Sequence, residues 1–218
     1  MKNFLLALVF ALTLCNTIFA QNSPNGAATG SGCGADQVSN SNLFGPGGPE
    51  KKCVVYGGYL TIGPYSGALL ASYAITDNIF LVGVAEARAD KLYPKFATRI
   101  AYNKDAGIFV FTSPRDQFLS TGLSRKLSLG KHLIIANLGP KFIWGKVRKT
   151  HAFAGISDTY EISPRLLVFG EVYRVAGDTV IAIGATHKVN NSAVEASFFI
   201  NAEQKQVGFS LLLTSAHK

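Results

Sequence analysis

Histidines, serines and carboxylates are the residues of this chain that could support hydrolysis, because a nucleophilic hydroxyl needs a histidine base within hydrogen-bond reach. The closest combination along the sequence is "HAFAGISD", which contains His151, Ser157 and Asp158. In an extended strand Ser157 would lie roughly 20 Å from His151, too far for proton transfer. The phospholipase-like arrangement, a histidine and a serine two residues apart on one strand face, is expected to be missing, since His187 is followed by Lys188 and Val189. The sequence therefore predicts no catalytic residues and no enzymatic activity.

Metal and cofactor sites are not predicted either. The chain has three cysteines but no CxxC motif, and its four histidines are widely separated from one another and from the cysteines. The glycines of "GSGCGADQ" neither follow a predicted strand nor precede a predicted helix, so they do not form a phosphate-binding loop. We expect no metal and no cofactor.

The N-terminus carries the pattern of an export signal. Lys2 precedes an apolar run from Phe4 to Cys15, and the short side chain of Ala20 follows. This pattern predicts a signal peptide at residues 1–20, because a run of about 12 apolar residues is shorter than the roughly 20 that a membrane-spanning helix needs. The mature chain is therefore expected outside the cytoplasm.

Residues 21–52 are dense in Gly, Ser, Asn and Pro, and they show almost no apolar periodicity. We interpret this part as a flexible N-terminal segment, with a small plug or binding loop as the alternative. Once the signal peptide is removed, Cys33 and Cys53 remain as an even pair in an oxidising compartment. This pair predicts a disulfide bond.

The chain is basic, with a net charge of +8 that falls to +7 when Lys2 leaves with the signal peptide. Export and the lack of a motif that mixes basic and aromatic residues argue against nucleic-acid binding. Lys146, Arg148 and Lys149 form a basic cluster in a predicted outer loop. At a membrane surface this cluster could bind lipopolysaccharide phosphates, or its members could be ordinary solvated loop charges.

The elements that must position these residues are short strands. From Cys53 onward, runs rich in Val, Ile, Phe, Tyr and Ala are interrupted by turn-forming residues such as Thr76-Asp77-Asn78 and Ser163-Pro164. About twelve such segments follow one another, with lengths near those of tilted membrane strands. The turns "TDN", "NKDA", "LGK", "ISP" and "VNN" are tight, whereas "ADKLYPK" and "GKVRKT" on the opposite side predict longer loops.

Side chains alternate along these segments. In "KFATRIAYN", Phe96 and Ile100 share an apolar face, while Ala97 and Arg99 share the other face. The non-apolar faces are mostly small or polar, with few charges, which favours a barrel that turns its apolar face to lipid and its polar face to a lumen. Pro140 breaks a long segment, so either a bulge lies at this point or the segment is a hairpin.

The segments "SYAITDNIFLVGV" and "YEISPRLLVFGEVYR" resemble the strand–turn–strand repeats of bacterial outer-membrane β-barrel proteins. The resemblance runs from about Cys53 to Ser215 and is generic, because it identifies an architecture of porin type and no subfamily. It implies a Gram-negative outer-membrane location and contact with outer-membrane lipid.

We therefore predict an all-β fold, an antiparallel up-and-down transmembrane β-barrel of about twelve strands over residues 53–218. The predicted function is a small porin-like channel or a structural membrane protein. If the lumen is open to small solutes or ions, a mild preference for anions is expected. In the alternative, side chains fill and close the lumen, and its charged groups pair with one another. The candidate lumen residues are Glu86, Arg88, Lys95, Arg99, Lys141, Glu171 and Glu195.

Two alternatives remain open from the residues alone. The first is a soluble periplasmic or extracellular β-barrel or sandwich that binds an apolar ligand or a protein partner. The second is an outer-membrane lipid-modifying enzyme, for which the sequence offers no active site.

Overall fold

The computed structural model describes residues 53–62, 66–76, 78–88, 91–103, 105–145, 148–175 and 177–217. The expected signal peptide (1–20) and N-terminal segment (21–52) lie outside these described residues, and their boundaries remain predictions. The described residues contain no helix with the length and hydropathy needed to cross a membrane.

Twelve strands make up nearly all of the described chain. They are β1 (Val54–Ile62), β2 (Ser66–Ala74), β3 (Ile79–Arg88), β4 (Lys91–Asn103), β5 (Ala106–Ser113), β6 (Phe118–Leu129), β7 (His132–Ile143), β8 (Lys149–Ser163), β9 (Leu166–Val175), β10 (Asp178–Val189), β11 (Ser192–Asn201) and β12 (Gln206–His217).

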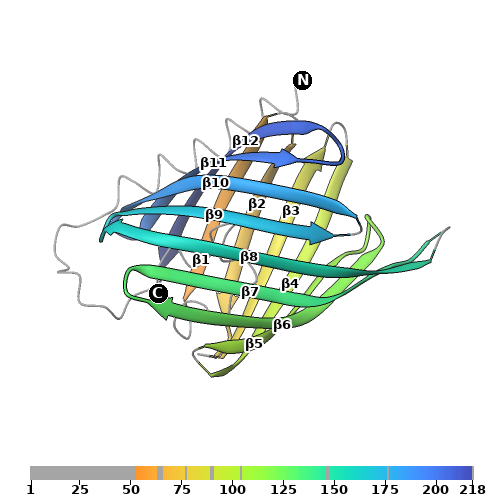
Figure 1. Ribbon diagram of the computed structural model, residues 1–218, viewed down its shortest axis with the longest axis horizontal. Helices are drawn as coiled ribbons and strands as arrows, with labels where there is room; N and C mark the ends of the chain where they lie inside the picture. The colour runs from red at the N-terminus through yellow and green to blue at the C-terminus, as the bar shows by residue number, and fades with distance from the viewer. Residues whose placement is uncertain are drawn as a thin grey trace.

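The strands form one closed barrel in which each strand pairs antiparallel with its neighbours in sequence, and β1 pairs with β12 (Figure 1). The closing pair runs from Val54 opposite His217 to Ile62 opposite Phe209. We call the end of the barrel that holds Val54 and His217 the terminal rim, and the opposite end the far rim. The predicted antiparallel barrel of about twelve strands is confirmed.

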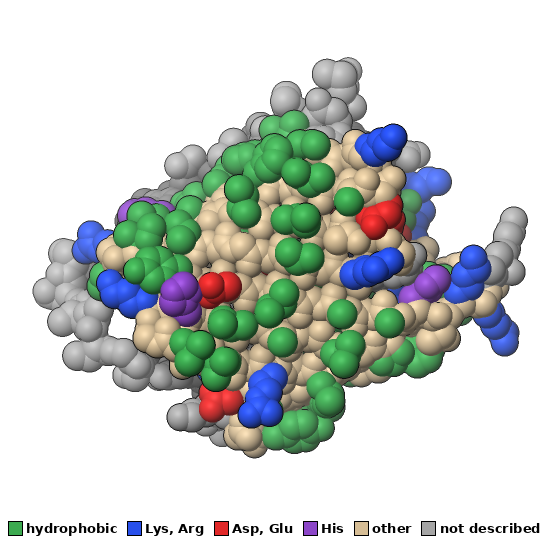
Figure 2. Space-filling model, in the orientation of Figure 1, with side chains coloured by type: hydrophobic (Ala, Val, Ile, Leu, Met, Phe, Trp, Pro, Cys, Tyr) green, Lys and Arg blue, Asp and Glu red, His purple; other side chains and the backbone are tan. Residues whose placement is uncertain are grey.

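The outer surface of the barrel is apolar. On β12, Phe209 is 43% exposed whereas its neighbour Ser210 is 7% exposed, and on β4 Phe96 is exposed whereas Ala97 and Arg99 are buried. Figure 2 shows hydrophobic side chains spread over the middle of the outer surface. Because a water-soluble barrel would turn such side chains inward, this belt is the surface expected of a barrel in lipid.

Short polar side chains hold the tight turns at the terminal rim. In the β2–β3 turn, the Thr76 hydroxyl oxygen accepts hydrogen bonds from the backbone N–H groups of Asn78 (3.1 Å) and Ile79 (3.0 Å). In the β4–β5 turn, Asn103 Oδ1 accepts hydrogen bonds from the N–H groups of Asp105 and Ala106, both at 2.8 Å. These local bonds explain why the turn residues of the sequence predict the hairpins correctly.

The prediction of long loops at the far rim is wrong. Strand β4 begins at Lys91 and β8 begins at Lys149, so most of "ADKLYPK" belongs to a strand and "GKVRKT" is shortened. The ladders continue to the ends of these strands, where Arg88 pairs with Lys91 and Ile143 pairs with Lys149. These residues were predicted to be loops because their side chains are charged, although the alternation of the strand continues through them. Figure 1 shows β8 reaching past β9 at this rim, where Val175, the last residue of β9, pairs with Phe153 of β8.

Pro140 lies within β7, and the segment is neither a hairpin nor a bulge. The β6–β7 register is the same on both sides of the proline, but the ladder is interrupted between the pairs Ser120–Lys141 and Leu123–Leu138. Gly122 and Gly139 lie in this gap. A Cβ atom on Gly139 would overlap the carbonyl oxygen of Thr121, and a Cβ atom on Gly122 would overlap the carbonyl oxygen of Leu138. The two glycines therefore allow β6 and β7 to approach closely next to Pro140, which has no N–H group to donate to the ladder.

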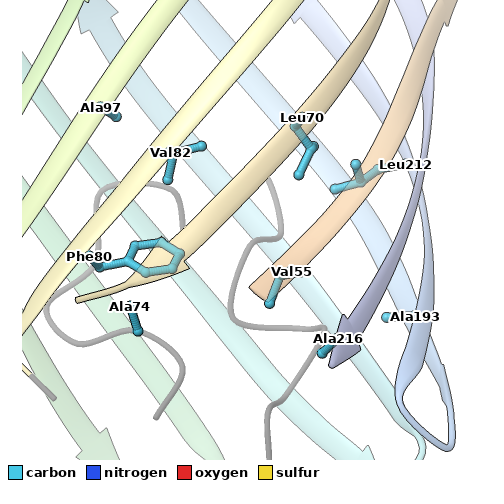
Figure 3. Close-up of a cluster of buried hydrophobic side chains, with 9 residues drawn as sticks. All are labelled: Val55, Leu70, Ala74, Phe80, Val82, Ala97, Ala193, Leu212 and Ala216. Atoms are coloured by element: carbon cyan, nitrogen blue, oxygen red, sulfur yellow. The ribbon is translucent and has the colours of Figure 1, made fainter. Parts of the chain in front are cut away.

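The inner wall is partly apolar, unlike the polar lumen that the sequence suggested. In β3, Phe80 and Val82 share the inner face with Glu86 and are buried. They belong to a cluster of apolar side chains that come from strands β1, β2, β3, β4, β11 and β12 (Figure 3). We call this set the apolar cluster, which comprises Val55, Leu70, Ala74, Phe80, Val82, Ala97, Ala193, Leu212 and Ala216.

A candidate binding cavity in the barrel lumen

The lumen contains a cavity of about 510 Å³ that extends to the far rim. Phe118, Asp178 and Asn201 line it, and each is the strand residue nearest the far rim in β6, β10 and β11, respectively. Its volume falls in the range of small-molecule sites in proteins. The antiparallel alternation places every second side chain of each strand on this wall.

Aromatic rings provide a large share of the cavity wall. Phe111 and Phe118 contact each other edge to face, with ring centroids 5.3 Å apart, and Phe153 contacts the buried Phe109 at 5.6 Å. The aromatic residues that line the cavity are Tyr59, Phe111, Phe118, Phe153, Tyr173 and Phe199. Between them lie small polar groups, namely Thr61, Ser120, Asn137, Ser157, Ser197, Asn201 and Ser210.

An ion-pair network occupies one side of the lumen near the far rim. Arg88 Nη2 lies 2.7 Å from Glu86 Oε2, and Arg88 Nη1 lies 3.0 Å from Asp116 Oδ1. Lys95 pairs with the same Glu86 carboxylate, and the Ser113 hydroxyl donates to Asp116 Oδ2 at 2.8 Å. Two cations and two anions neutralise one another here, so this network adds little net charge to the lumen.

Lys141 is the cavity cation outside this network. Its Nζ lies 4.3 Å from the centre of the Phe118 ring, a cation–π contact, and no carboxylate of the described residues lies within ion-pair distance of it. Lys141 is two residues from the end of β7 at the far rim, whereas Glu171 lines the cavity deeper, in the middle of β9. A solute entering from the far rim meets the lysine first.

The remaining predicted lumen residues lie closer to the terminal rim. Arg99 is buried with its guanidinium carbon 4.2 Å from the centre of the Phe80 ring. Glu195 is buried and accepts a hydrogen bond from the Thr186 hydroxyl at 3.2 Å. All seven candidates therefore have inner-wall positions, but only Lys95, Lys141 and Glu171 line the cavity.

The other predicted sites are only partly described. Lys146 and Cys33 lie outside the described residues, so the disulfide stays a prediction; Cys53 is buried at the start of the barrel. Arg148 is exposed beside the far rim, and Lys149 is exposed as the first residue of β8 and is not in a loop. Lipopolysaccharide binding by this group remains a prediction.

Sequence reasoning missed contacts between strands. Asp158 pairs with His132, whose Nδ1 lies 2.9 Å from Asp158 Oδ2 on the outer face, and not with His151. The cavity aromatics were also missed, although strand alternation would have placed them inward once the strands were aligned.

A histidine and a serine two residues apart do occur on one strand face, so the prediction that this arrangement is missing is wrong. Ser215 Oγ lies 3.4 Å from His217 Nε2 on the outer face of β12. The same nitrogen lies closer, at 3.0 Å, to the Tyr56 hydroxyl, and the Tyr56 ring stacks on the imidazole. The sequence signal was the "SAH" at residues 215–217.

No protein-family model and no curated protein sequence matches this chain. Solved structures do match its fold. The KdgM porin in complex with disordered oligogalacturonate aligns with a TM-score of 0.62 and 10% identity over 76% of this chain and 99% of that chain. The NanC porin aligns with a TM-score of 0.57 and 7% identity over 75% of this chain and 98% of that chain. Omp33 of Acinetobacter baumannii aligns with a TM-score of 0.50 and 11% identity over 76% of this chain and 98% of that chain. At these identities the likeness concerns the fold, and the predicted porin-like barrel architecture is confirmed.

Proposed function

We propose that this chain is an outer-membrane barrel of porin type whose far-rim cavity admits small anionic solutes. The observation that carries the proposal is the cavity itself, which combines aromatic rings with Lys141 inside a closed barrel that has an apolar outer belt. The belt favours this function over the soluble alternative, because a soluble barrel has no reason to expose such a surface.

The chemistry of the wall suggests the class of solute. Aromatic faces stack against flat or ring-shaped solutes, and the small polar groups between them can exchange hydrogen bonds with hydroxyls. The ammonium of Lys141 attracts a carboxylate or phosphate, and the exposed basic residues Arg115, Arg148 and Lys149 add positive charge near the same rim. An acidic carbohydrate, the ligand class named for the KdgM porin, combines these features.

The proposal is tested by conductance of the mature protein in a planar bilayer, recorded across a salt gradient. Lys141→Glu should lower the ratio of anion to cation permeability by about fivefold, the equivalent of roughly 1 kcal/mol of charge interaction in water. Lys131→Glu is the matched control, because the same charge change lies in an exposed turn at the terminal rim. Equal ion selectivity of the native chain and the Lys141→Glu variant would refute the role of Lys141. A folded barrel without conductance would refute the proposal that solutes pass through the lumen.

We propose no catalytic activity for this chain. The contact between Ser215 and His217 is long for a nucleophile and its base, and the histidine nitrogen that would act as the base is nearer to Tyr56. The membrane-enzyme alternative depends on this contact, which makes Ser215 the residue to test.

A further inference from the structure

The charged side chains that line the far-rim cavity differ in whether they have a partner. Lys95 belongs to the ion-pair network, and Lys141 contacts an aromatic ring. Asp178 Oδ2 accepts a hydrogen bond from Gln204 Nε2 at 3.1 Å. Glu171 is different, because no described residue forms a hydrogen bond or an ion pair with its carboxylate. Since an ionised carboxylate away from bulk water is costly without a partner, a cationic group is the ligand that this position favours.

The wall around Glu171 is made of small residues. Glu171 pairs with Ser157 of β8 on one side and with Ala182 of β10 on the other side. Gly155, two residues from Ser157 on the same strand face, has no side chain. All three neighbours line the cavity. Because none of them reaches far into the lumen, the space in front of the carboxylate is open to a solute.

Aromatic groups border this open space. Tyr173 is the next inward-facing residue of β9, and Phe153 lies on the inner face of β8. A Cβ atom at Gly155 would lie 3.2 Å from Tyr173 Cβ and 3.7 Å from Cζ of Phe153, so both aromatic residues border the same part of the wall. A carboxylate beside aromatic rings is suited to an ammonium group, because charge pairing and cation–π contacts act on the same cation.

Lys141 is too far away to be this cation. Ile135 of β7 is aligned with Glu171 through Ser157, and Lys141 lies six residues further along β7. At about 3.3 Å per residue, this offset is roughly 20 Å along the strands, more than a lysine side chain can bridge. The cavity therefore has a positive group near the far rim and a negative group deeper in the lumen, well separated from each other.

We propose that Glu171 binds the ammonium group of a solute, so that the cavity takes small anionic solutes that also carry an amine. The inference rests on the proposed entry of anionic solutes at the far rim, and it names a second group that these solutes carry. The acidic group of such a solute is attracted by Lys141 at the entrance, and the amine binds Glu171 deeper in the lumen. A sugar with both a phosphate or carboxylate and an amine has this combination of charges.

The test compares the binding of two sugars to the refolded mature chain at neutral pH by isothermal titration calorimetry. Glucosamine 6-phosphate and glucose 6-phosphate share the ring and the phosphate, but the first has an ammonium group where the second has a hydroxyl. We expect the native chain to bind the amino sugar about tenfold more tightly, and Glu171→Gln to bind both sugars equally. Equal affinities in the native chain, or no binding of either sugar, would overturn the proposal.

Two further variants locate the amine. Glu161→Gln makes the same charge change at an exposed position of β8 that does not line the cavity, so it should keep the preference for the amino sugar. Ala182→Leu fills the space next to the Glu171 carboxylate without changing the charge, so it should remove this preference. An unchanged preference in the Ala182→Leu variant would place the amine elsewhere and contradict the assignment.

Heat-modifiable migration checks that each barrel is folded. The binding measurement needs no ion flow, so it and the channel test fail separately. A chain that binds the amino sugar without conducting would refute the passage of solutes and support the ammonium site. A chain that conducts without preferring the amino sugar would support the passage and refute the site.

Discussion

Ser215 has the arrangement in this barrel that comes closest to a nucleophile beside its base. We expect the purified protein to show no ester hydrolysis that depends on Ser215, because the hydroxyl is 3.4 Å from His217 Nε2 while Tyr56 lies closer. The measurement compares hydrolysis of a short-chain nitrophenyl ester by the native chain, Ser215→Ala and Ser192→Ala.

Ser192 is the matched control for this assay, because it is a serine of the neighbouring strand whose hydroxyl lies 3.2 Å from Ser215 Oγ. A loss of about a hundredfold or more in Ser215→Ala alone would contradict the expectation and assign a general-base role to His217. Equal rates in all three proteins would leave the contact as a structural one.

At the residue scale, the alternation along a strand predicts the wall on which a side chain lies, but it does not predict the partner of that side chain on the next strand. Arg99 and Lys141 could be assigned to the inner wall because alternation depends only on neighbours along one strand. The pairing of Glu86 with Lys95, or of His132 with Asp158, depends on the register between strands. Register comes from turns and bulges together, so a one-residue error in either changes every partner.

At the scale of elements, the β6–β7 ladder is interrupted around Gly122 and Gly139. We expect Gly139→Ala to lower the free energy of unfolding by about 1–3 kcal/mol, because the added methyl group would overlap the Thr121 carbonyl and force the two strands apart. Reversible urea unfolding in lipid vesicles measures the change.

Gly170→Ala is the control for this prediction. Gly170 is also a strand glycine, but a Cβ at this position has no atom within 4 Å, so the substitution should cost little. Equal destabilisation by both substitutions would show that loss of backbone freedom, and not the close approach of β6 and β7, determines the effect.

Strand number could be predicted from the sequence because the turn residues are short-range signals with a local mechanism. Loop length at the far rim could not be predicted, because a lysine is compatible both with a strand end and with a loop, and Lys91 and Lys149 are the first residues of β4 and β8. The sequence also could not decide how Pro140 fits a strand, since the answer depends on Gly122 across the pair.

At the scale of the whole molecule, adjacent residues of one strand lie in different surroundings, one in the apolar outer belt and the next on the wall of the lumen. Phe209→Arg should lower the free energy of unfolding by about 2–4 kcal/mol in a bilayer, because Phe209 belongs to the exposed belt. Ser210→Arg, one residue further along, adds the same side chain to the cavity wall and should leave the barrel folded while changing its conductance. Vesicle unfolding and bilayer recording measure the two effects.

The opposite pattern, in which Ser210→Arg unfolds the barrel and Phe209→Arg does not, would exchange the two faces and contradict the membrane orientation. Unfolding by both variants would mean that the wall around Ser210 has no room for a long side chain.

The pairing of β1 with β12 also determines when the barrel can exist. Eleven of its twelve strand pairs join neighbours in the chain and can form as successive hairpins, but the twelfth joins Val54 to His217. Until β12 has been added, the growing sheet has two open edges, each with unpaired N–H and C=O groups that can bond to another chain. The last strand to be made is therefore the one that separates a finished barrel from an aggregation-prone sheet.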